Sequence, residues 1–240
     1  IHTAQYWFGR ARTPSGEVLA SEIPGKDSYV HRKSKGVVAA ITPWNFPFAI
    51  PLWLICPSVA EGNTVVFKPA EETPLTGQRI VEYFEKVGLP AGVLNLVHGY
   101  GEEAGWPLVV HHQVDVVLFT GSAAVGSKIK EACAQDYRKF CVCEMGGKNA
   151  MIIFDDADFE MAVNAAVLSA FRTAGQRCVS AERLIVQEGI FDRFAQAFVT
   201  RARHIRIGDP LAPDTFMGPL VNQAGVEKFE HYNKLAIAEG

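Results

Sequence analysis

Short apolar runs rich in β-branched residues alternate along this chain with longer segments in which apolar residues recur every three or four positions. The short runs predict strands of a sheet covered on both faces, and the longer segments predict amphipathic helices. Strands are expected at 36–41, 64–68, 93–97, 116–120 and 140–144, with helices at 51–61, 75–87 and 125–134. This repeated order predicts an α/β fold with a doubly wound, mainly parallel sheet of the dinucleotide-binding type.

The alternation starts again after Gly146-Gly147. Three aspartates at 155, 156 and 158 precede an apolar helical segment, where acidic side chains cap and stabilise a helix N-terminus. Strands are expected at 151–154 and 182–187, helices at 159–173, 191–204 and 226–239, and a Pro/Gly-rich loop at 208–219. The second half therefore predicts the start of a second α/β domain.

Near the start of the chain, residues 16–21 and 28–35 read as extended segments joined by Pro24-Gly25. They predict a protruding β-hairpin that leaves the sheet and returns at Gly36. Its unpaired edges would invite another subunit, so a homo-oligomer is expected.

Composition narrows the class of protein. With 48% apolar and 20% charged residues, the chain is typical of globular proteins, and its net charge of −3 argues against a nucleic-acid partner. Five scattered cysteines favour a reducing, cytoplasmic compartment over a disulfide framework. Cys141 and Cys143 stand two residues apart on a predicted strand, and no CxxC or His pair completes a metal site with them. The apolar stretch 46–60 is too short and too rich in proline to span a membrane.

Three motifs carry candidate chemistry: Pro43-Trp44-Asn45-Phe46-Pro47, Glu144-Met145-Gly146-Gly147-Lys148 and Gly175-Gln176-Arg177-Cys178. Cys178 stands 34 residues after Glu144 and 133 residues after Asn45. A thiol, a carboxylate and an amide are the nucleophile, general base and oxyanion donor that oxidation of an aldehyde through a thioester requires.

These motifs and their intervals resemble the NAD(P)-dependent aldehyde dehydrogenase superfamily, over the central portion of its subunit. The resemblance implies that Cys178 attacks an aldehyde, that Asn45 binds the oxyanion and that Glu144 activates the hydrolytic water. The expected product is a carboxylic acid.

The resemblance also implies where a nicotinamide dinucleotide binds. Gly121-Ser122 and Val125-Gly126 lie at a strand-to-helix turn that resembles the family's pyrophosphate-contacting turn, where free N–H groups face an anion. Lys68-Pro69-Ala70-Glu71 resembles its ribose-binding motif. A carboxylate at Glu71 would repel a 2′-phosphate, which favours NAD and leaves NADP open. Further cofactor contacts are expected from Ile41, Thr42, Pro43, Trp44 and Met145.

Arg172, six residues before Cys178, resembles an arginine of the succinate-semialdehyde branch that grips the far carboxylate of its substrate. That branch has a second arginine eight residues after the oxyanion asparagine, where this chain has Trp53. We therefore expect a semialdehyde with an acidic tail, contacted by Arg172, Trp53 and Phe171. A structural ion pair of Arg172 is the alternative.

By this resemblance, residues 1–11 and 36–146 form an NAD-binding domain, 12–35 an oligomerisation hairpin of a homodimer or homotetramer, and 147–240 a catalytic domain. Both domains are incomplete by the family's standard. Two other functions stay open. One is a non-catalytic or truncated protein on the same scaffold, and the other is a CoA-acylating dehydrogenase. The presence of Glu144 favours hydrolysis.

Overall fold

The computed structural model describes residues 2–13 and 16–240 and divides into two compact units, Ile1–Met145 and Gly146–Gly240. Residue 1 of the predicted segment 1–11 lies outside the described part, and so do residues 14 and 15 of the predicted segment 12–35. The nucleotide-binding and catalytic roles expected of the two halves stay predictions.

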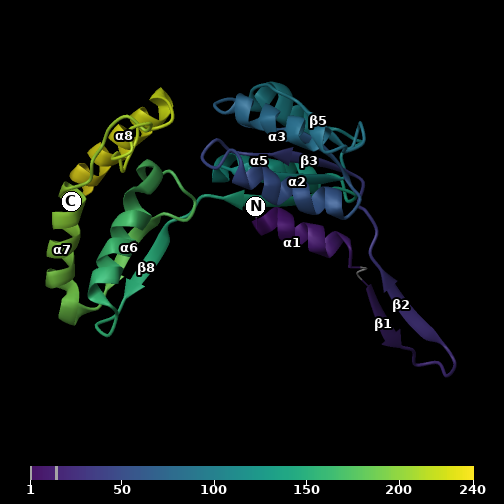
Figure 1. Ribbon diagram of the computed structural model, residues 1–240, viewed down its shortest axis with the longest axis horizontal. Coiled ribbons are helices and arrows are strands. Elements are labelled where there is room, and N and C mark those ends of the chain that lie inside the picture. The colour runs from purple at the N-terminus through teal and green to yellow at the C-terminus, as the bar shows by residue number, and fades with distance from the viewer. Residues whose placement is uncertain (1, 14–15) are drawn as a thin grey trace. The chain divides into compact units, whose positions relative to one another are not determined.

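The first unit is built on a parallel sheet of five strands in the order β5-β4-β3-β6-β7. Figure 1 labels β3 and β5 of this sheet, together with helices α2, α3 and α5. From β3 the chain winds outward through β4 to β5, and it then returns to the other side of β3 with β6 and β7. The sheet therefore has a topological switch point between β3 and β6, as the predicted doubly wound fold requires. The strands are β3 Val37–Ile41, β4 Thr64–Lys68, β5 Leu94–Leu96, β6 Val116–Gly121 and β7 Phe140–Met145.

Helices cover both faces of this sheet, which explains why its central strands read as continuous apolar runs. On one face α2 and α3 bury Ile55 and Ile80 against Phe67. On the other face α4 and α5 bury Val109 and Ile129 against strand residues of β3 and β6. These helices are α2 Ala49–Ala60, α3 Pro74–Lys86, α4 Trp106–Val110 and α5 Ala123–Ala134, with a π-helical turn η1 at Gly101–Gly105.

One helix of this unit was not predicted. Helix α1, His2–Ala11, packs against α2, but none of its residues is buried. The helix therefore adds no buried side chain to the core of this unit.

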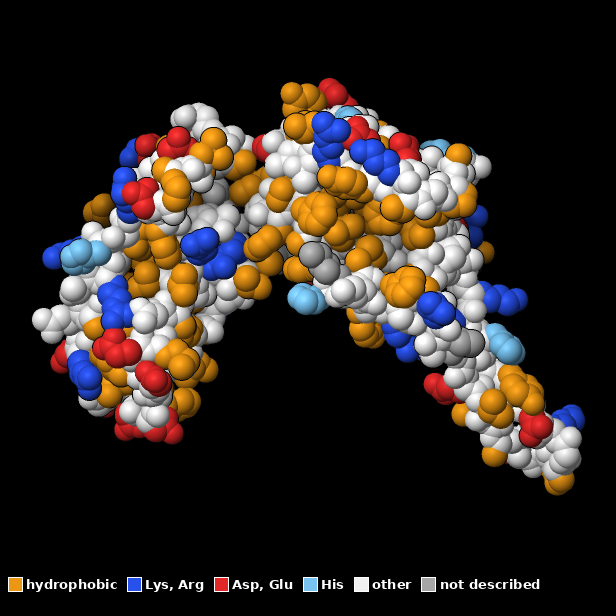
Figure 2. All heavy atoms as spheres, viewed as in Figure 1, with side chains coloured by type: hydrophobic (Ala, Val, Ile, Leu, Met, Phe, Trp, Pro, Cys, Tyr) orange, Lys and Arg blue, Asp and Glu red, His pale blue; other side chains and the backbone are white. Residues whose placement is uncertain are grey.

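The predicted hairpin is confirmed as an antiparallel pair, β1 Gly16–Ala20 with β2 Asp27–His31. The two strands form a sheet of their own, and all of their residues are exposed. Val18 and Tyr29 are among its exposed apolar residues. The space-filling view shows hydrophobic side chains on the surface of this ribbon (Figure 2).

The second unit pairs β8 Asn149–Ile153 with β9 Ala181–Val186 in parallel. Helices α6 Phe159–Phe171 and α7 Phe191–Arg203 pack around Phe194 and Ile153. Both helices are labelled in Figure 1. The unit also contains the short helices η2 Arg172–Gly175 and η3 Glu188–Ile190, and α8 Gln223–Glu239. Asp158 caps α6 by accepting from the Met161 amide, as the aspartates predicted.

Three of the helix boundaries that differ from the prediction have a local cause. The predicted helix 159–173 ends at Phe171, because Thr173 and Ala174 adopt left-handed backbone angles. Helix α5 begins two residues early because Ser122 caps it, and α8 begins three residues early behind the cap of Asn222. Side-chain caps fix the first residue of both helices, and the spacing of apolar residues does not predict where a cap lies.

Candidate active site

The register of the first unit brings four predicted motifs to one edge of the sheet. Ile41 lies opposite both Lys68 and Phe119, and Glu144 lies opposite Thr120. Because these strands are parallel, the segments that follow them leave from the same carboxyl edge. Ligands of open α/β sheets bind at this edge, at the switch point.

Lys68 and Glu71 form an ion pair at this edge, with 2.8 Å between Lys68 Nζ and Glu71 Oε2. The Lys68 side chain is 3% exposed, whereas that of Glu71 is 39% exposed and can reach a ligand. Partial burial alone would raise the pKa of Glu71, but the hydrogen bond from Lys68 and a backbone hydrogen bond outweigh it and lower the pKa. The carboxylate is therefore ionised at neutral pH and can accept hydrogen bonds from hydroxyl groups.

The buried Pro69 and Ala70 between them have little room to move. A Cβ built on Gly77 of α3 would lie 2.6 Å from Pro69 Cγ, so only glycine lets α3 approach so closely.

At the start of α5, Ser122 caps the helix with its hydroxyl, and the Gly126 amide donates to the Ser122 carbonyl. A Cβ on Gly121 would lie 2.4 Å from Phe119 Cζ, and a Cβ on Gly126 would lie 2.5 Å from Met145 Sδ. The glycines thus permit a tight turn that presents a helix N-terminus at the sheet edge, an arrangement that fits a phosphate group.

A cavity of about 320 Å³ lies beside this turn at the switch point. Apart from two charged residues, its lining is mainly apolar, which suits a flat aromatic ring more than a second phosphate. Its lining residues are Ile41, Gly101, Glu102, Gly105, Trp106, Val109, Phe119, Val125, Lys128 and Ile129. Of these residues, Ile41 and Val125 were predicted as cofactor contacts. Glu102, Trp106 and Lys128 were not, because they belong to no sequence motif that indicates a ligand site.

The loop between β3 and α2 carries the predicted oxyanion donor. Asn45 and Trp44 are half-buried in it, and Trp53 on α2 is 51% exposed. The Thr42 amide donates to the Lys68 carbonyl at 3.2 Å, which ties the loop to the end of β4. The buried Thr42 Oγ1 has no hydrogen-bond partner within the described residues.

Glu144 is exposed near the end of β7, where Met145 is the last strand residue. The predicted base and the predicted oxyanion donor thus belong to the same edge of one sheet.

Cys178 belongs to the second unit, in the loop between η2 and β9, and it is exposed. In this unit Arg172 lies over the ring of Phe216, with its guanidinium carbon 5.6 Å from the ring centroid. Phe171 stacks on Phe198 with centroids 5.8 Å apart. Lys148 pairs with Glu182, which places its charge beside an acid of the same unit. The approach of Cys178 to Asn45 and Glu144 stays a prediction.

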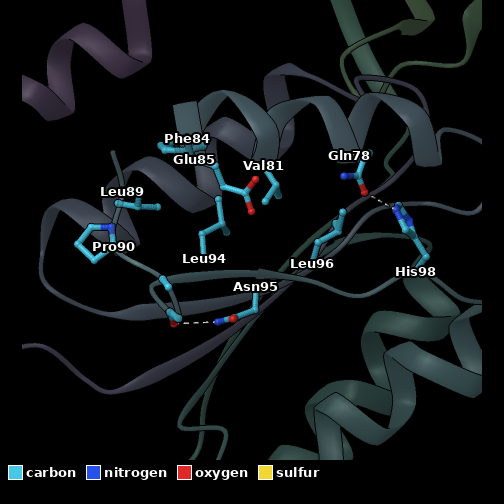
Figure 3. A pocket seen from close by; sticks show the side chains of 12 residues that line it. Gln78, Val81, Phe84, Glu85, Leu89, Pro90, Leu94, Asn95, Leu96 and His98 are labelled. Carbon is cyan, nitrogen blue, oxygen red and sulfur yellow. Dashed lines mark hydrogen bonds between the residues drawn. The ribbon is translucent and has the colours of Figure 1, made fainter. Parts of the chain in front are cut away.

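A second cavity of the first unit, about 490 Å³, lies between α3 and β5 (Figure 3). Val81 and Leu94 contribute apolar side chains, and on its rim His98 and Gln78 form a hydrogen bond of 3.4 Å. None of the predicted site residues lines it. This cavity is therefore separate from the predicted catalytic and cofactor-binding residues.

Among the described residues, no group of three or more His, Cys, Asp or Glu side chains is placed to hold a metal ion. Nor does that part of the chain contain a helix with the length and apolar character needed to cross a bilayer.

The switch-point sheet, its glycine turn and its Lys–Glu pair define an open α/β protein of the dinucleotide-binding class. The whole chain, residues 1–240, matches the aldehyde dehydrogenase family, and it belongs to this family.

Among its relatives, alpha-ketoglutaric semialdehyde dehydrogenase of Bacillus subtilis (strain 168) is 42% identical over all of this chain and 49% of its own length. Mitochondrial succinate-semialdehyde dehydrogenase of Arabidopsis thaliana is 40% identical over 98% of this chain and 44% of its own. The crystal structure of betaine aldehyde dehydrogenase from Staphylococcus aureus in complex with NAD+ superposes with a TM-score of 0.95 at 41% identity, over 100% of this chain and 47% of that one. The chain spans about half the length of the curated relatives it matches.

Proposed function

We propose that the protein oxidises an aldehyde to a carboxylic acid with a nicotinamide dinucleotide, through a thioester formed on Cys178. The observation that carries this proposal is the carboxyl edge of the first sheet, from which the segments bearing Asn45, Lys68-Glu71, the glycine turn and Glu144 all leave. The exposed thiol of the second unit supplies the nucleophile. Membership of the aldehyde dehydrogenase family supports the same chemistry.

In this mechanism the Cys178 thiolate adds to the aldehyde carbon. The Asn45 amide and the backbone N–H of Cys178 donate to the oxyanion that forms, which stabilises it where charge develops. A nicotinamide dinucleotide, when bound, would supply the acceptor for the hydride that the thiohemiacetal loses as it becomes the thioester. Glu144 then takes a proton from a water molecule that attacks the thioester, so the carboxylic acid leaves and the thiol is restored.

The cofactor is proposed to be NAD, with NADP as the alternative. Glu71 would accept hydrogen bonds from a ribose, with Lys68 beside it, and the turn at Gly121–Gly126 would hold the pyrophosphate. The cavity of about 320 Å³ at the switch point would hold an aromatic ring of the bound dinucleotide. Thr42, whose buried Oγ1 has no hydrogen-bond partner within the described residues, is a further proposed contact. The remaining proposed contacts come from Ile41, Pro43, Trp44, Pro69, Ala70, Ser122, Val125 and Met145.

The test is a Cys178→Ser variant of the complete natural polypeptide, with Cys56→Ser on α2 as the matched control. NADH formation from a panel of aldehydes and hydrolysis of an activated ester are both measured. We expect Cys178→Ser to lose on the order of 10⁴-fold or more in turnover and Cys56→Ser to behave as wild type. Full turnover without the sulfur would refute the mechanism. Acyl-CoA as the product would instead identify the CoA-acylating alternative.

For the substrate, we propose a semialdehyde with a carboxylate or phosphonate tail held by Arg172. The Arg172 side chain is exposed, and its contact with Phe216 leaves the N–H groups of the guanidinium able to bind an anion. Two relatives are named for acidic semialdehydes, whereas the structural relative is named for betaine aldehyde. Trp53 and Phe171 are proposed to contact the same substrate.

Succinate semialdehyde, betaine aldehyde and an uncharged aldehyde of similar length separate these cases. We expect Arg172→Gln to raise the KM for succinate semialdehyde about tenfold or more, and to leave the KM for the uncharged aldehyde unchanged. Arg172→Lys should retain part of the effect. An unchanged KM for succinate semialdehyde would remove Arg172 from the substrate site.

We also propose that the hairpin β1–β2 joins subunits in a homodimer or homotetramer. Its support is the ribbon's full exposure and its apolar side chains, including Val18, Tyr29 and Val30. Val18→Lys should shift the sedimentation profile toward smaller species, and an unchanged profile would exclude the hairpin.

A further inference from the structure

The loop that carries Cys178 is held on both sides by side chains to which the proposed mechanism gives no part. We propose that Arg177 and Asn149 are positioning residues, which fix the main chain around Cys178 so that the thiol and the Cys178 N–H point where the reaction needs them. This inference rests on the proposed function, because it assigns residues to the same nucleophile.

Arg177, the residue directly before Cys178, reaches back to the end of α6. Its Nη2 donates to the carbonyl oxygens of Leu168 at 2.9 Å and Ser169 at 3.0 Å. The Leu168 carbonyl also accepts from the Arg172 N–H at the end of α6, and a cation beside the last carbonyls of a helix interacts favourably with the helix dipole. The loop is thereby anchored to α6 just ahead of the nucleophile.

Asn149, the first residue of β8, anchors the other side. Its Nδ2 donates to the carbonyl oxygens of Cys178 and Ser180, the latter at 3.0 Å. One amide nitrogen has two hydrogens, so both are used on the main chain at and after the nucleophile. Next to it, the Ala181 amide donates to Ser169 Oγ at 3.0 Å, which leads the loop into β9.

The backbone just before these anchors is strained. Thr173, Ala174 and Gly175 have φ angles of 60°, 54° and 69°, so three successive residues are left-handed. For residues with a side chain this region costs about 1–2 kcal/mol each, and such angles persist only where the surroundings enforce them. A strained loop would relax without its anchors, and Cys178 would move with it.

Small movements of the nucleophile matter to the rate. A displacement of about 1 Å can cost on the order of 10²-fold, because the reacting atoms must be held about 3–3.5 Å apart and aligned. Rotation of the peptide between residues 177 and 178 would also turn away the N–H proposed to face the oxyanion. The anchors should therefore affect turnover and thiol reactivity more than binding.

The test uses Asn149→Asp in the complete natural polypeptide. The change keeps the shape of the side chain but replaces the donor with an oxygen that faces two carbonyl oxygens. We expect the pH-independent rate of Cys178 alkylation by iodoacetamide to fall about tenfold and kcat to fall about 10–100-fold, with the KM for aldehyde and NAD within twofold. Asn164→Asp on α6 is the control, because it makes the same change where the side-chain oxygen accepts from Arg201. It should leave both rates unchanged.

Arg177→Lys is the second variant, in case Asn149→Asp does not fold. It keeps the charge but shortens the side chain and loses the fixed direction of the Nη2 N–H groups, so an intermediate loss of alkylation rate and kcat is expected. Rates are measured per folded molecule, well below the melting temperature. If either folded variant keeps the wild-type alkylation rate and kcat, even with a lowered Tm, the positioning role is overturned.

The two proposals fail in different ways. If Cys178→Ser retains NADH formation, the proposed function falls whatever the anchors do. If Cys178→Ser is inactive while Asn149→Asp and Arg177→Lys react and turn over as wild type, the function stands and only the anchoring inference is lost.

Discussion

In the first unit, the proposed cofactor residues stand at the ends of strands whose two faces are covered by helices, whereas in the second unit Cys178 stands on an exposed loop beside a sheet of only two strands. Lys68 is nearly inaccessible, and its partner Glu71 is held by a hydrogen bond to it. Cys178 is fixed through its neighbours' hydrogen bonds and a left-handed turn. Burial therefore holds Lys68 and its ion pair with Glu71 in the first unit. In the second unit, hydrogen bonds from side chains to the main chain hold the loop that carries Cys178.

Removing a core aromatic side chain should have the largest effect on stability, and this effect should be confined mainly to the unit that contains it. Phe67 and Phe194 are 0% and 1% exposed. Each change to alanine is expected to lower the free energy of unfolding by about 3–5 kcal/mol. Hydrogen exchange followed peptide by peptide should show lost protection mainly in the unit that carries the substitution. Equal losses in both units for either variant would contradict the contrast.

Crowding the sheet edge should have the next largest effect. Gly77→Ala places a methyl group against the rigid ring of Pro69, which must displace α3 or the segment that carries Lys68 and Glu71. We expect a loss of about 1–3 kcal/mol in the free energy of unfolding, and weaker NAD binding by calorimetry. Gly9→Ala in α1 is the control, because nothing lies within 4 Å of the added carbon. Unchanged NAD affinity in Gly77→Ala would show that packing does not position this motif.

Neutralising Glu71 should change cofactor choice more than stability. Glu71→Gln removes the charge that repels a 2′-phosphate, so the kcat/KM ratio of NADP to NAD should rise about tenfold, which corresponds to about 1.4 kcal/mol. Glu72→Gln is the matched control and should leave the ratio unchanged.

The pH dependence of this preference follows from the lowered pKa of Glu71. A depressed pKa keeps the carboxylate charged as the pH falls, so the wild-type preference for NAD should stay constant from about pH 8 to about pH 5. It should weaken only as the pH falls below the ordinary glutamate value of about 4.3. A preference that already titrates near neutral pH would exclude Glu71 as its cause.

Relieving the turn before Cys178 should have the smallest effect. Ala174→Gly removes a left-handed cost of about 1–2 kcal/mol but adds about 0.4–1 kcal/mol of entropy to the unfolded chain, so a gain of about 0.5 kcal/mol is expected. Ala170→Gly in α6 should instead lose about 1 kcal/mol in denaturant titrations. If both glycines destabilise equally, the turn is not strained.

The elements with strong periodicity were predictable. Strand β4 lies at the predicted residues 64–68, and α3 lies within one residue of its prediction, because both bury a continuous apolar face. Helix α2 begins two residues before the predicted Pro51. Helix α1 was not predicted, and it buries none of its residues.

For the site, the sequence identified the chemical groups but not their supports. No local signal marks Asn149 as a partner of the Cys178 carbonyl, 29 residues away, or Arg177 as a partner of the end of α6. Thr173 and Ala174 are residue types that rarely adopt a left-handed conformation, so the sequence does not predict one there. Of the three residues in the turn, only Gly175 favours it.

What the sequence by itself determined is the order of strands and helices, together with the thiol, amide, carboxylates and glycines that make up the proposed chemistry. The tertiary structure alone decided the strand register that sends four motifs from one edge, the burial of Lys68 beside Glu71, and the left-handed turn beside Cys178. The reason is physical. Periodicity and capping act between residues a few positions apart, whereas register, burial and long-range hydrogen bonds depend on which surfaces pack together.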